Sequence, residues 1–256
     1  MLIDKIVEQA QLNLKAVKIK DVVVGISLMG VQLDNGHVGV SYTIREDLPN
    51  GCSIFPYAQE MIGKPAGEMA EWLVNGKEDL QRGIGMAVIT AASQSLPVAD
   101  VDNPGLTFGI NVLPTDNVGM IGYIKPVAKE FSNKAKKVKI FDMGLSLRGG
   151  EKVDLYPTEK QSEELADCDI VTLSGTTVVN NTIDELLDMC KNAREIVMIG
   201  PSTPMLPAAF KDTNITVLAG SWWNNDKKDE IFKKISLACG VSHLSKYMIK
   251  KCISVR

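Results

Sequence analysis

Short apolar runs alternate with helical patterns through the second half of the chain, and this alternation limits the fold more than any other feature. The runs are VGMIGYI, KVKIFDMG, DIVTLSG, EIVMIG and ITVLAG, and helical patterns such as PVAKEFSNKAK and TIDELLDMCKNA separate most of them. Nearly continuous apolar strands separated by helices are typical of a parallel sheet covered on both faces. We therefore predict an α/β fold in which residues 106–256 form a Rossmann-like, doubly wound domain.

The first half, residues 1–105, has a different pattern, which predicts a hairpin backed by helices. A helix is expected over residues 2–17, followed by two β-rich runs, VVVGISLMGVQL and HVGVSYTI. Asn35-Gly36 lies between these runs and suits the positive φ angles of a tight hairpin turn. Helical patterns follow in GEMAEWLV and EDLQRGIGMAVITAASQSL, and Pro, Asp, Asn and Gly mark a junction over residues 98–117. This half is predicted to be an α+β module.

Composition excludes several classes of partner. The chain has 256 residues, 45% of them hydrophobic, and a formal net charge of -3, which provides no general attraction to nucleic acid. Residues 227–256 carry eight Lys or Arg against two Asp or Glu; a solvated helix face with a basic last strand is favoured over an anion-binding edge. The longest uncharged stretch, residues 83–99, is shorter than a membrane span of about 20 residues. Five scattered cysteines without a CxxC pair fit a reducing compartment, so we expect a soluble, cytoplasmic protein.

Ligands of open parallel sheets bind outside the carboxyl ends of the strands, so the loops there are the candidate site. Gly122 follows the first run, but GMIGYI is not a G-x-G-x-x-G fingerprint, which argues against ordinary NAD binding. Asp142 closes the second run. There it would either meet a ribose hydroxyl or serve as a turn residue.

The stretch SGTTVVNN follows the third run and is rich in hydrogen-bond donors. Its candidate ligand-binding residues are Ser174, Gly175, Thr176, Thr177, Asn180 and Asn181. Thr182 stands three residues before Glu185, the spacing of a capping box. Small hydroxyls and amides around a helix start suit a phosphate, carboxylate or carbonyl group.

The stretch IGPSTPMLP follows the fourth run and admits two interpretations. A PxxP segment is a ligand for partner proteins when it is exposed and extended. Because it lies here between a strand and a helical pattern, we expect a rigid ligand loop instead. We predict that Ser202 or Thr203 caps a helix beginning at Pro204. The candidate residues are Gly200, Pro201, Ser202, Thr203 and Pro204.

Trp222 and Trp223 are expected just past the last run, where one could stack on a planar ligand or both could lie in the core. The common catalytic sequences G-x-S-x-G, P-loop and HExxH are missing, and the two histidines, His37 and His243, lack the spacing of metal ligands. Glu46, Asp47 and Cys52 share a Gly- and Pro-rich loop in which exposure is the simpler explanation. No metal site is predicted, and the sequence does not identify a cofactor.

SGTTVVNNTIDELL, GPSTPMLP and VGMIGYIKPVAKEF together resemble a prokaryotic domain family of unknown function that is associated with heavy-metal chelation. The resemblance implies an enolase N-terminal-like domain joined to a Rossmann-like domain, with a site between them and a role in making or handling a metal chelator. It implies site residues at Gly122, Gly175, Thr176, Thr177, Asn180, Gly200, Ser202, Thr203 and Pro204. Thr90 is a further candidate ligand-binding residue; it stands where a family helix tends to carry Asn, so an amide role is not carried over there.

Two hypotheses for the function follow. The chain is either an enzyme acting on a planar or phosphorylated metabolite, such as a pterin-, flavin- or siderophore-like molecule, or a non-catalytic binder of a metal–chelate complex. Neither nucleic acid nor membrane is expected as a partner. The apolar hairpin offers an edge through which two copies could pair, so a homo-oligomer is a further prediction.

Overall fold

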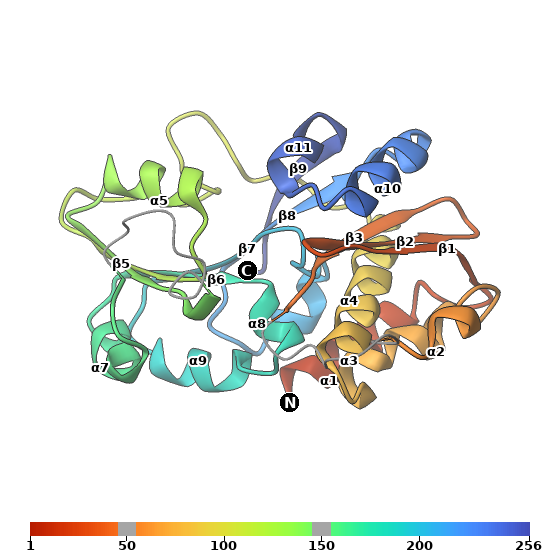
Figure 1. Cartoon of the computed structure of the whole chain (residues 1–256). Coiled ribbons are helices and arrows are strands. Elements are labelled where there is room, and N and C mark those ends of the chain that lie inside the picture. The colour runs from red at the N-terminus through yellow and green to blue at the C-terminus, as the bar shows by residue number, and fades with distance from the viewer. Residues whose placement is uncertain (46–54, 145–154) are drawn as a thin grey trace.

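The computed structural model describes residues 1–45, 55–144 and 155–256 (Figure 1). Glu46, Asp47 and Cys52 lie outside the described residues. The elements of the first half are α1 (Leu2–Gln11), β1 (Ile19–Val24), β2 (Leu28–Leu33), β3 (Val38–Tyr42), η1 (Ala58–Glu60), α2 (Ala66–Ala70), α3 (Trp72–Asn75) and α4 (Asp79–Ser93).

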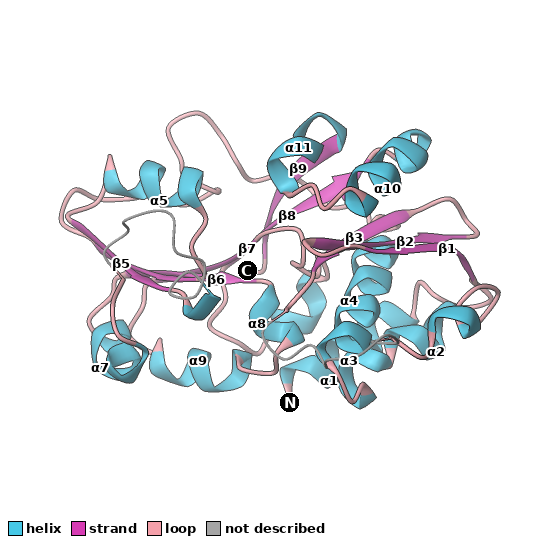
Figure 2. Cartoon of the chain, viewed as in Figure 1, coloured by secondary structure: helices cyan, strands magenta, loops and turns pink. Residues whose placement is uncertain are grey.

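The second half begins with β4 (Asn117–Ile121), α5 (Lys125–Ser132), β5 (Lys137–Phe141), η2 (Thr158–Lys160), α7 (Gln161–Ala166), β6 (Ile170–Ser174), α8 (Thr176–Val179) and α9 (Ile183–Met189). It continues with β7 (Glu195–Ile199), η3 (Pro207–Phe210), β8 (Val217–Trp223), η4 (Asn225–Lys227), α10 (Lys228–Ser236), α11 (Val241–Leu244), η5 (Ser245–Tyr247) and β9 (Met248–Ser254). All five apolar runs form strands, and the predicted α/β class is confirmed (Figure 2).

The hairpin of the first half forms as predicted, with an additional strand before it. β2 pairs antiparallel with β3, and Gly36 in the turn between them has a φ of 93°. The run of residues 22–33 is not one strand. It breaks into β1 and β2 because the chain turns at Gly25, whose position leaves no room for a side chain: an added Cβ would lie 2.4 Å from the Ile235 carbonyl oxygen. The first helix is shorter than predicted and ends at Gln11.

The larger sheet has the strand order β5-β4-β6-β7-β8-β9, in which β9 alone is antiparallel to its neighbour. From β4 the chain moves outward to β5 and then returns past β4 to β6. The direction of winding therefore reverses between β4 and β6, which is the switch point where ligands bind in folds of this kind. Helix α5 lies on one face of this sheet and helices α7 and α9 lie on the other, as a doubly wound sheet requires (Figure 1).

The two halves share their packing. α4 covers one face of the three-stranded sheet, and α10, from the second half, covers the other. A Cβ on Gly30 of β2 would lie 2.8 Å from the Phe232 ring of α10, so this glycine permits close contact between sheet and helix. At the opposite end, the Leu2 backbone N–H donates to the Asp184 carboxylate of α9 at 3.3 Å. One buried apolar cluster includes residues of both halves.

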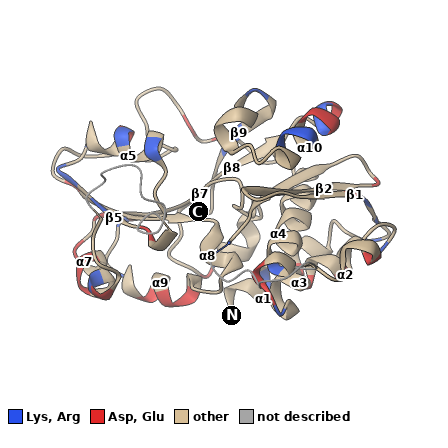
Figure 3. Cartoon of the chain, viewed as in Figure 1, with Lys and Arg blue, Asp and Glu red and all other residues tan. Residues whose placement is uncertain are grey.

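Charges of both signs alternate on the surface of α10 (Figure 3). Lys227 pairs with Glu230 at 3.0 Å, and Lys228 pairs with Asp21 of β1 at 2.8 Å. This mixture agrees with the expected solvated helix face, and the basic last strand is β9. Within the described residues, no helix combines the length and apolar character needed to cross a bilayer.

Candidate functional site

The loops after β4 and β6 meet at the switch point. Gly122 has a φ of 86°, a left-handed conformation that favours glycine, and an added Cβ would lie 2.9 Å from the Ser174 Cβ. The end of β5 joins this contact through Asp142, whose carboxylate accepts a hydrogen bond from the Tyr123 N–H at 2.7 Å. Three strand ends are thus held together by local contacts. We call Gly122, Tyr123, Asp142, Ser174 and Thr176 the switch-point face.

Hydroxyl groups of the SGTT stretch fix its turn. The Ser174 hydroxyl oxygen accepts from the Thr176 hydroxyl at 2.8 Å and from the Thr176 N–H at 3.4 Å. The Thr177 hydroxyl donates to the Ser174 carbonyl at 2.8 Å and is buried. Ser174 and Thr176 are half-buried, whereas Gly175 and Thr177 are buried, so the first two are the residues of this turn that stay partly exposed.

Asn180 closes the short helix α8. With its amide nitrogen turned toward the helix, it donates to the carbonyls of Thr177 at 3.0 Å and Thr176 at 3.2 Å, and to the Thr182 hydroxyl at 2.8 Å. The predicted capping box is wrong, because Thr182 precedes α9 without a side-chain cap to it. Asn181 is exposed and has a φ of 61°. The Asn180 amide therefore supports the loop from within.

Arg82 of α4 reaches α8 from the first half, and sequence reasoning missed it. Its Nε donates to the Val179 carbonyl at 2.9 Å, its Nη1 donates to the Gly76 carbonyl at 3.0 Å, and its Nη2 pairs with Asp79. One guanidinium thus ties the end of α8 to two points of the first half. An arginine on a helix has no local signal that would have predicted this contact.

The GPST loop is buried and joins the two halves. Ser202 and Thr203 are each 1% exposed, and the Ser202 hydroxyl oxygen accepts from the Tyr42 N–H of β3 at 2.8 Å. It also lies 3.1 Å from the Ser41 hydroxyl. The predicted helix at Pro204 is wrong, because the next helical turn, η3, begins at Pro207. Ser202 therefore binds the edge of β3 and does not cap a helix.

The GPST loop is buried because its backbone lies against the backbone of the SGTT loop. A Cβ on Gly175 would lie 2.4 Å from the Ser202 carbonyl carbon, so the SGTT and GPST loops touch along their main chains. Gly200 has a φ of 115°, and the chain leaves β7 there. Gly200 and Pro201 are half-buried, whereas Pro204 is buried.

Thr90 and Trp222 lie away from the switch-point face. Thr90 is 2% exposed inside α4, and its hydroxyl donates to the Ala87 carbonyl at 2.9 Å. Trp222 is within β8 and not beyond it, which corrects the prediction. β8 is three strands from β4, or ~14 Å across the sheet. The Lys251 ammonium lies 5.4 Å from the Trp222 ring centroid, and Trp223 is buried in the core.

The electrostatics of the thiols argue against their use as nucleophiles. Burial raises the pKa of Cys168 to about 11, and it raises the pKa of Cys190 and of Cys252 to about 12. These thiols therefore stay protonated near neutral pH. Burial also lowers the pKa of His37, which lies in the hairpin of the first half. Among residues 1–45, 55–144 and 155–256, His, Cys, Asp and Glu form no cluster of three that could hold a metal ion.

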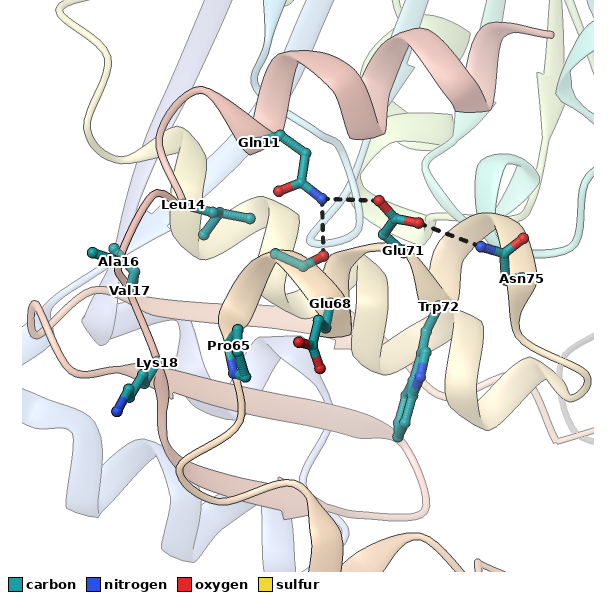
Figure 4. Close-up of a pocket in the computed structure, with 11 residues that line it drawn as sticks. Gln11, Leu14, Ala16, Val17, Lys18, Pro65, Glu68, Glu71, Trp72 and Asn75 are labelled. Carbon is teal, nitrogen blue, oxygen red and sulfur yellow. Dashed lines mark hydrogen bonds between the residues drawn. The ribbon is translucent and has the colours of Figure 1, made fainter.

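Two hollows, of about 810 and about 560 Å³, open on the surface of the first half. The larger lies between the end of α1 and helices α2 and α3 (Figure 4). The smaller lies beside β1 and the segment of residues 55–62, and Ser236 of α10 from the second half also lines it. Neither is lined by a predicted site residue.

Comparison with known proteins identifies the family. Residues 105–254 match the DUF364 family and residues 7–93 match DUF4213, both described as "Putative heavy-metal chelation". The chain belongs to the DUF364 family. The resemblance of its C-terminal loops to such a family is thereby confirmed.

Solved DUF364 structures have the same fold. A Pyrococcus horikoshii protein of unknown function has a TM-score of 0.76 at 23% identity, over 99% of this chain and 100% of that one. A Desulfitobacterium hafniense protein of unknown function has a TM-score of 0.76 at 19% identity, over 98% of each chain. An uncharacterized protein of Methanocaldococcus jannaschii is 28% identical over 156 residues, which are 56% of this chain and 54% of that protein. The chain thus spans about half the length of this curated relative.

Proposed function

We propose that the chain binds a small organic molecule at the switch-point face, and that this molecule is a chelator of heavy metals or its metal complex. The observation that carries the proposal is the contact of Gly122 with Ser174 where the winding of the sheet reverses. Crevices at such reversals are the usual ligand sites of open α/β sheets. The description of the DUF364 family supplies the ligand class.

The hydrogen bonds of this region favour binding over catalysis. Asp142 receives the Tyr123 N–H, and the Thr177 hydroxyl and Asn180 amide are used within their own turn. Side chains that hold loops in place create a preorganised surface, which lowers the entropy cost of ligand binding. The half-buried Ser174 and Thr176 hydroxyls suit the carbonyl or carboxylate oxygens of a pterin-, flavin- or siderophore-like molecule. Any metal would then be cargo, held by the chelator.

The first half would border the same site. Arg82 fixes the end of α8, and Tyr42 is joined to Ser202, so the loops of the second half are positioned against α4 and β3. This arrangement supports a ligand held between the two halves. Pairing of two copies through the hairpin is a separate prediction. Part of the hairpin's β3 edge is covered, since the Val38 N–H donates to the Asn225 side chain and the Tyr42 N–H donates to the Ser202 hydroxyl.

Native mass spectrometry of the gently purified protein, with elemental analysis of the same sample, tests this proposal. We expect an organic adduct that is lost in Ser174→Ala and in the Thr177→Ala/Asn180→Ala double variant. Ser245→Ala, at an exposed position of η5, is the matched control and should keep the adduct. Metal that arrives only with the adduct supports chelate binding. Retention of the adduct in Ser174→Ala, or stoichiometric uptake of free divalent metal by the adduct-free protein, contradicts the proposal. Chemical conversion of the adduct on incubation would instead support the enzyme hypothesis.

A further inference from the structure

The 810 Å³ hollow of the first half has a size suited to a small molecule and lies apart from the switch-point face. Pockets for drug-sized ligands are about 300–1,000 Å³. Its walls are the end of α1, the segment of residues 14–18 and the helices α2 and α3 (Figure 4). It therefore requires an explanation separate from the proposed function.

Two carboxylates line this hollow, on opposite sides of the helix in Figure 4. Glu71 is held in place by two amides, since Gln11 Nε2 donates to it at 3.3 Å and Asn75 Nδ2 at 3.4 Å. Gln11 Nε2 also donates to the Gly67 carbonyl at 2.9 Å, so this amide nitrogen is used within the wall. Glu68 is exposed three residues before Glu71 and makes no hydrogen bond or ion pair with the described residues. The wall thus offers acceptors and negative charge.

The apolar wall includes an indole ring with a fixed orientation. Trp72 is in edge-to-face contact with Phe55, at 6.4 Å between ring centroids, and with Tyr57, at 5.6 Å. These contacts fix the tilt of the ring without stacking another ring on it. Leu14 and Val17 add aliphatic surface. In Figure 4 the side chains of Trp72 and Glu68 extend from the helix toward the same side.

Charge decides the kind of ligand. Two carboxylates line the hollow against one cation, Lys18, whose ammonium points away from Glu68 (Figure 4). A positive group that lies between Glu68 and the Trp72 ring, which extend toward the same side, gains both Coulomb attraction and cation–π attraction. An anion would meet like charges there.

We propose that this hollow binds an organic cation, an ammonium or guanidinium group on an apolar stem. The positive group lies at Glu68 beside the Trp72 ring, Glu71 adds negative charge to the same hollow, and the stem lies along Leu14 and Val17. The inference rests on the hollow alone and is independent of the proposed chelator site. The same chemistry is found in a free amine and in a lysine or arginine side chain of a peptide.

Isothermal titration calorimetry with four probes tests the proposal. The probes are spermidine, benzyltrimethylammonium, a tetrapeptide with one central lysine, and acetate as the anionic control. We expect at least one of the three cations to bind and acetate not to bind. Glu68→Gln should weaken cation binding about 10-fold, and Trp72→Leu should weaken benzyltrimethylammonium most, because that cation donates no hydrogen bond. Tighter binding of the tetrapeptide than of spermidine identifies a protein side chain as the source; the reverse identifies a free amine.

Glu185→Gln is the matched control, since Glu185 is exposed on α9 and the variant changes the net charge equally. It should bind the cations as the wild type does. Equal binding by the Glu68→Gln and Glu185→Gln variants overturns the proposal, as does the failure of all three cations to bind at millimolar concentration. Thermal melting of each variant confirms that it is folded, and Trp72→Phe replaces Trp72→Leu if the latter is not.

Discussion

The Ser202 hydroxyl oxygen accepts a hydrogen bond from the Tyr42 backbone N–H at 2.8 Å, across 160 residues of sequence. Tyr42 ends β3, an edge strand whose outward backbone groups need partners. Asn225 provides another, since its side-chain oxygen accepts from the Val38 N–H at 3.0 Å at the other end of the same strand. Side chains of the second half thus complete the edge of the first sheet.

Replacing Ser202 with Ala should destabilise the fold. The change leaves the half-buried Tyr42 N–H without its acceptor, and the loss of such a partner costs about 1–3 kcal/mol where the group is buried. Urea denaturation measures the free energy of unfolding. Ser245→Ala is the control, because Ser245 is exposed. Equal stability of the two variants would show that water replaces Ser202 without cost.

Arg82→Met should loosen α8. The variant loses the hydrogen bonds to the Val179 and Gly76 carbonyls together with the Asp79 ion pair. We expect the amides of residues 176–180 to exchange with deuterium about 10-fold faster, a change of ~1.4 kcal/mol in the local opening free energy. Arg82→Lys should restore little, because a single ammonium lacks the fork of a guanidinium.

The control for this experiment is Lys191→Met, which removes an exposed cation. Its exchange should match that of the wild type. If exchange at residues 176–180 stays at the wild-type rate in Arg82→Met, then Asn180 alone holds α8.

Three glycine variants should separate backbone strain from crowding. Gly240→Ala should be neutral within about 0.5 kcal/mol, since its φ is -83° and nothing lies near an added Cβ. Gly36→Ala meets no atom but has a φ of 93°, so strain of about 1 kcal/mol is expected. Gly122→Ala combines a φ of 86° with a Cβ 2.9 Å from that of Ser174, and it should cost the most. Thermal or urea unfolding ranks the three, and a Gly122→Ala variant no less stable than Gly36→Ala would contradict the tight contact at the switch point.

Acid should remove the stabilisation that comes from Asp116. Burial by itself raises the pKa of this carboxyl, but hydrogen bonds from Arg194 and the Leu113 N–H, with the Arg194 charge, hold it below its ordinary value of 3.8. The folded state then binds fewer protons than the unfolded state. The contribution is complete well above pH 3.8 and is lost as the pH falls through the lower folded pKa.

Urea denaturation of wild type and Asp116→Asn from about pH 6 to about pH 3 measures this loss. The stability difference between them should be largest near pH 6 and should shrink toward pH 3. Asp188→Asn, at an exposed position, is the control and should show little pH-dependent difference. A wild-type advantage over Asp116→Asn that is constant over this range would show that Asp116 titrates alike in both states.

The strands of the larger sheet could be predicted because each is a short apolar run with helical pattern beside it. The hairpin could be predicted because the Asn35-Gly36 dipeptide by itself favours a tight turn. The close approach of α10 to Gly25 could not, because this helix is more than 200 residues away in sequence. The enolase-like character of the first half and the boundary near residue 105 stay predictions.

The candidate site was predicted less well than the fold. Local rules placed a helix at Pro204, but residues 203–205 pass over β8, where a Cβ on Gly220 would lie 2.4 Å from the Met205 sulfur. Tertiary packing overrode the local preference. Ser202 was predicted to face a ligand, and its actual partner, Tyr42, is remote in sequence. The contact between Gly122 and Ser174 depends on β4 and β6 being neighbours in the sheet. The alternation of apolar and helical patterns predicts a parallel sheet but does not give the order of its strands.

Because α10 covers one face of the first sheet, the order of synthesis limits how the chain can fold on the ribosome. A chain leaves the ribosome from its N-terminus, and domains usually fold as they emerge. Here β1, β2 and β3 emerge well before the helix that packs on Gly25 and Gly30, which is made from residues 228–236. One face of the first sheet therefore stays without its cover until α10 has been synthesised, so the first half cannot complete its packing when it alone has emerged.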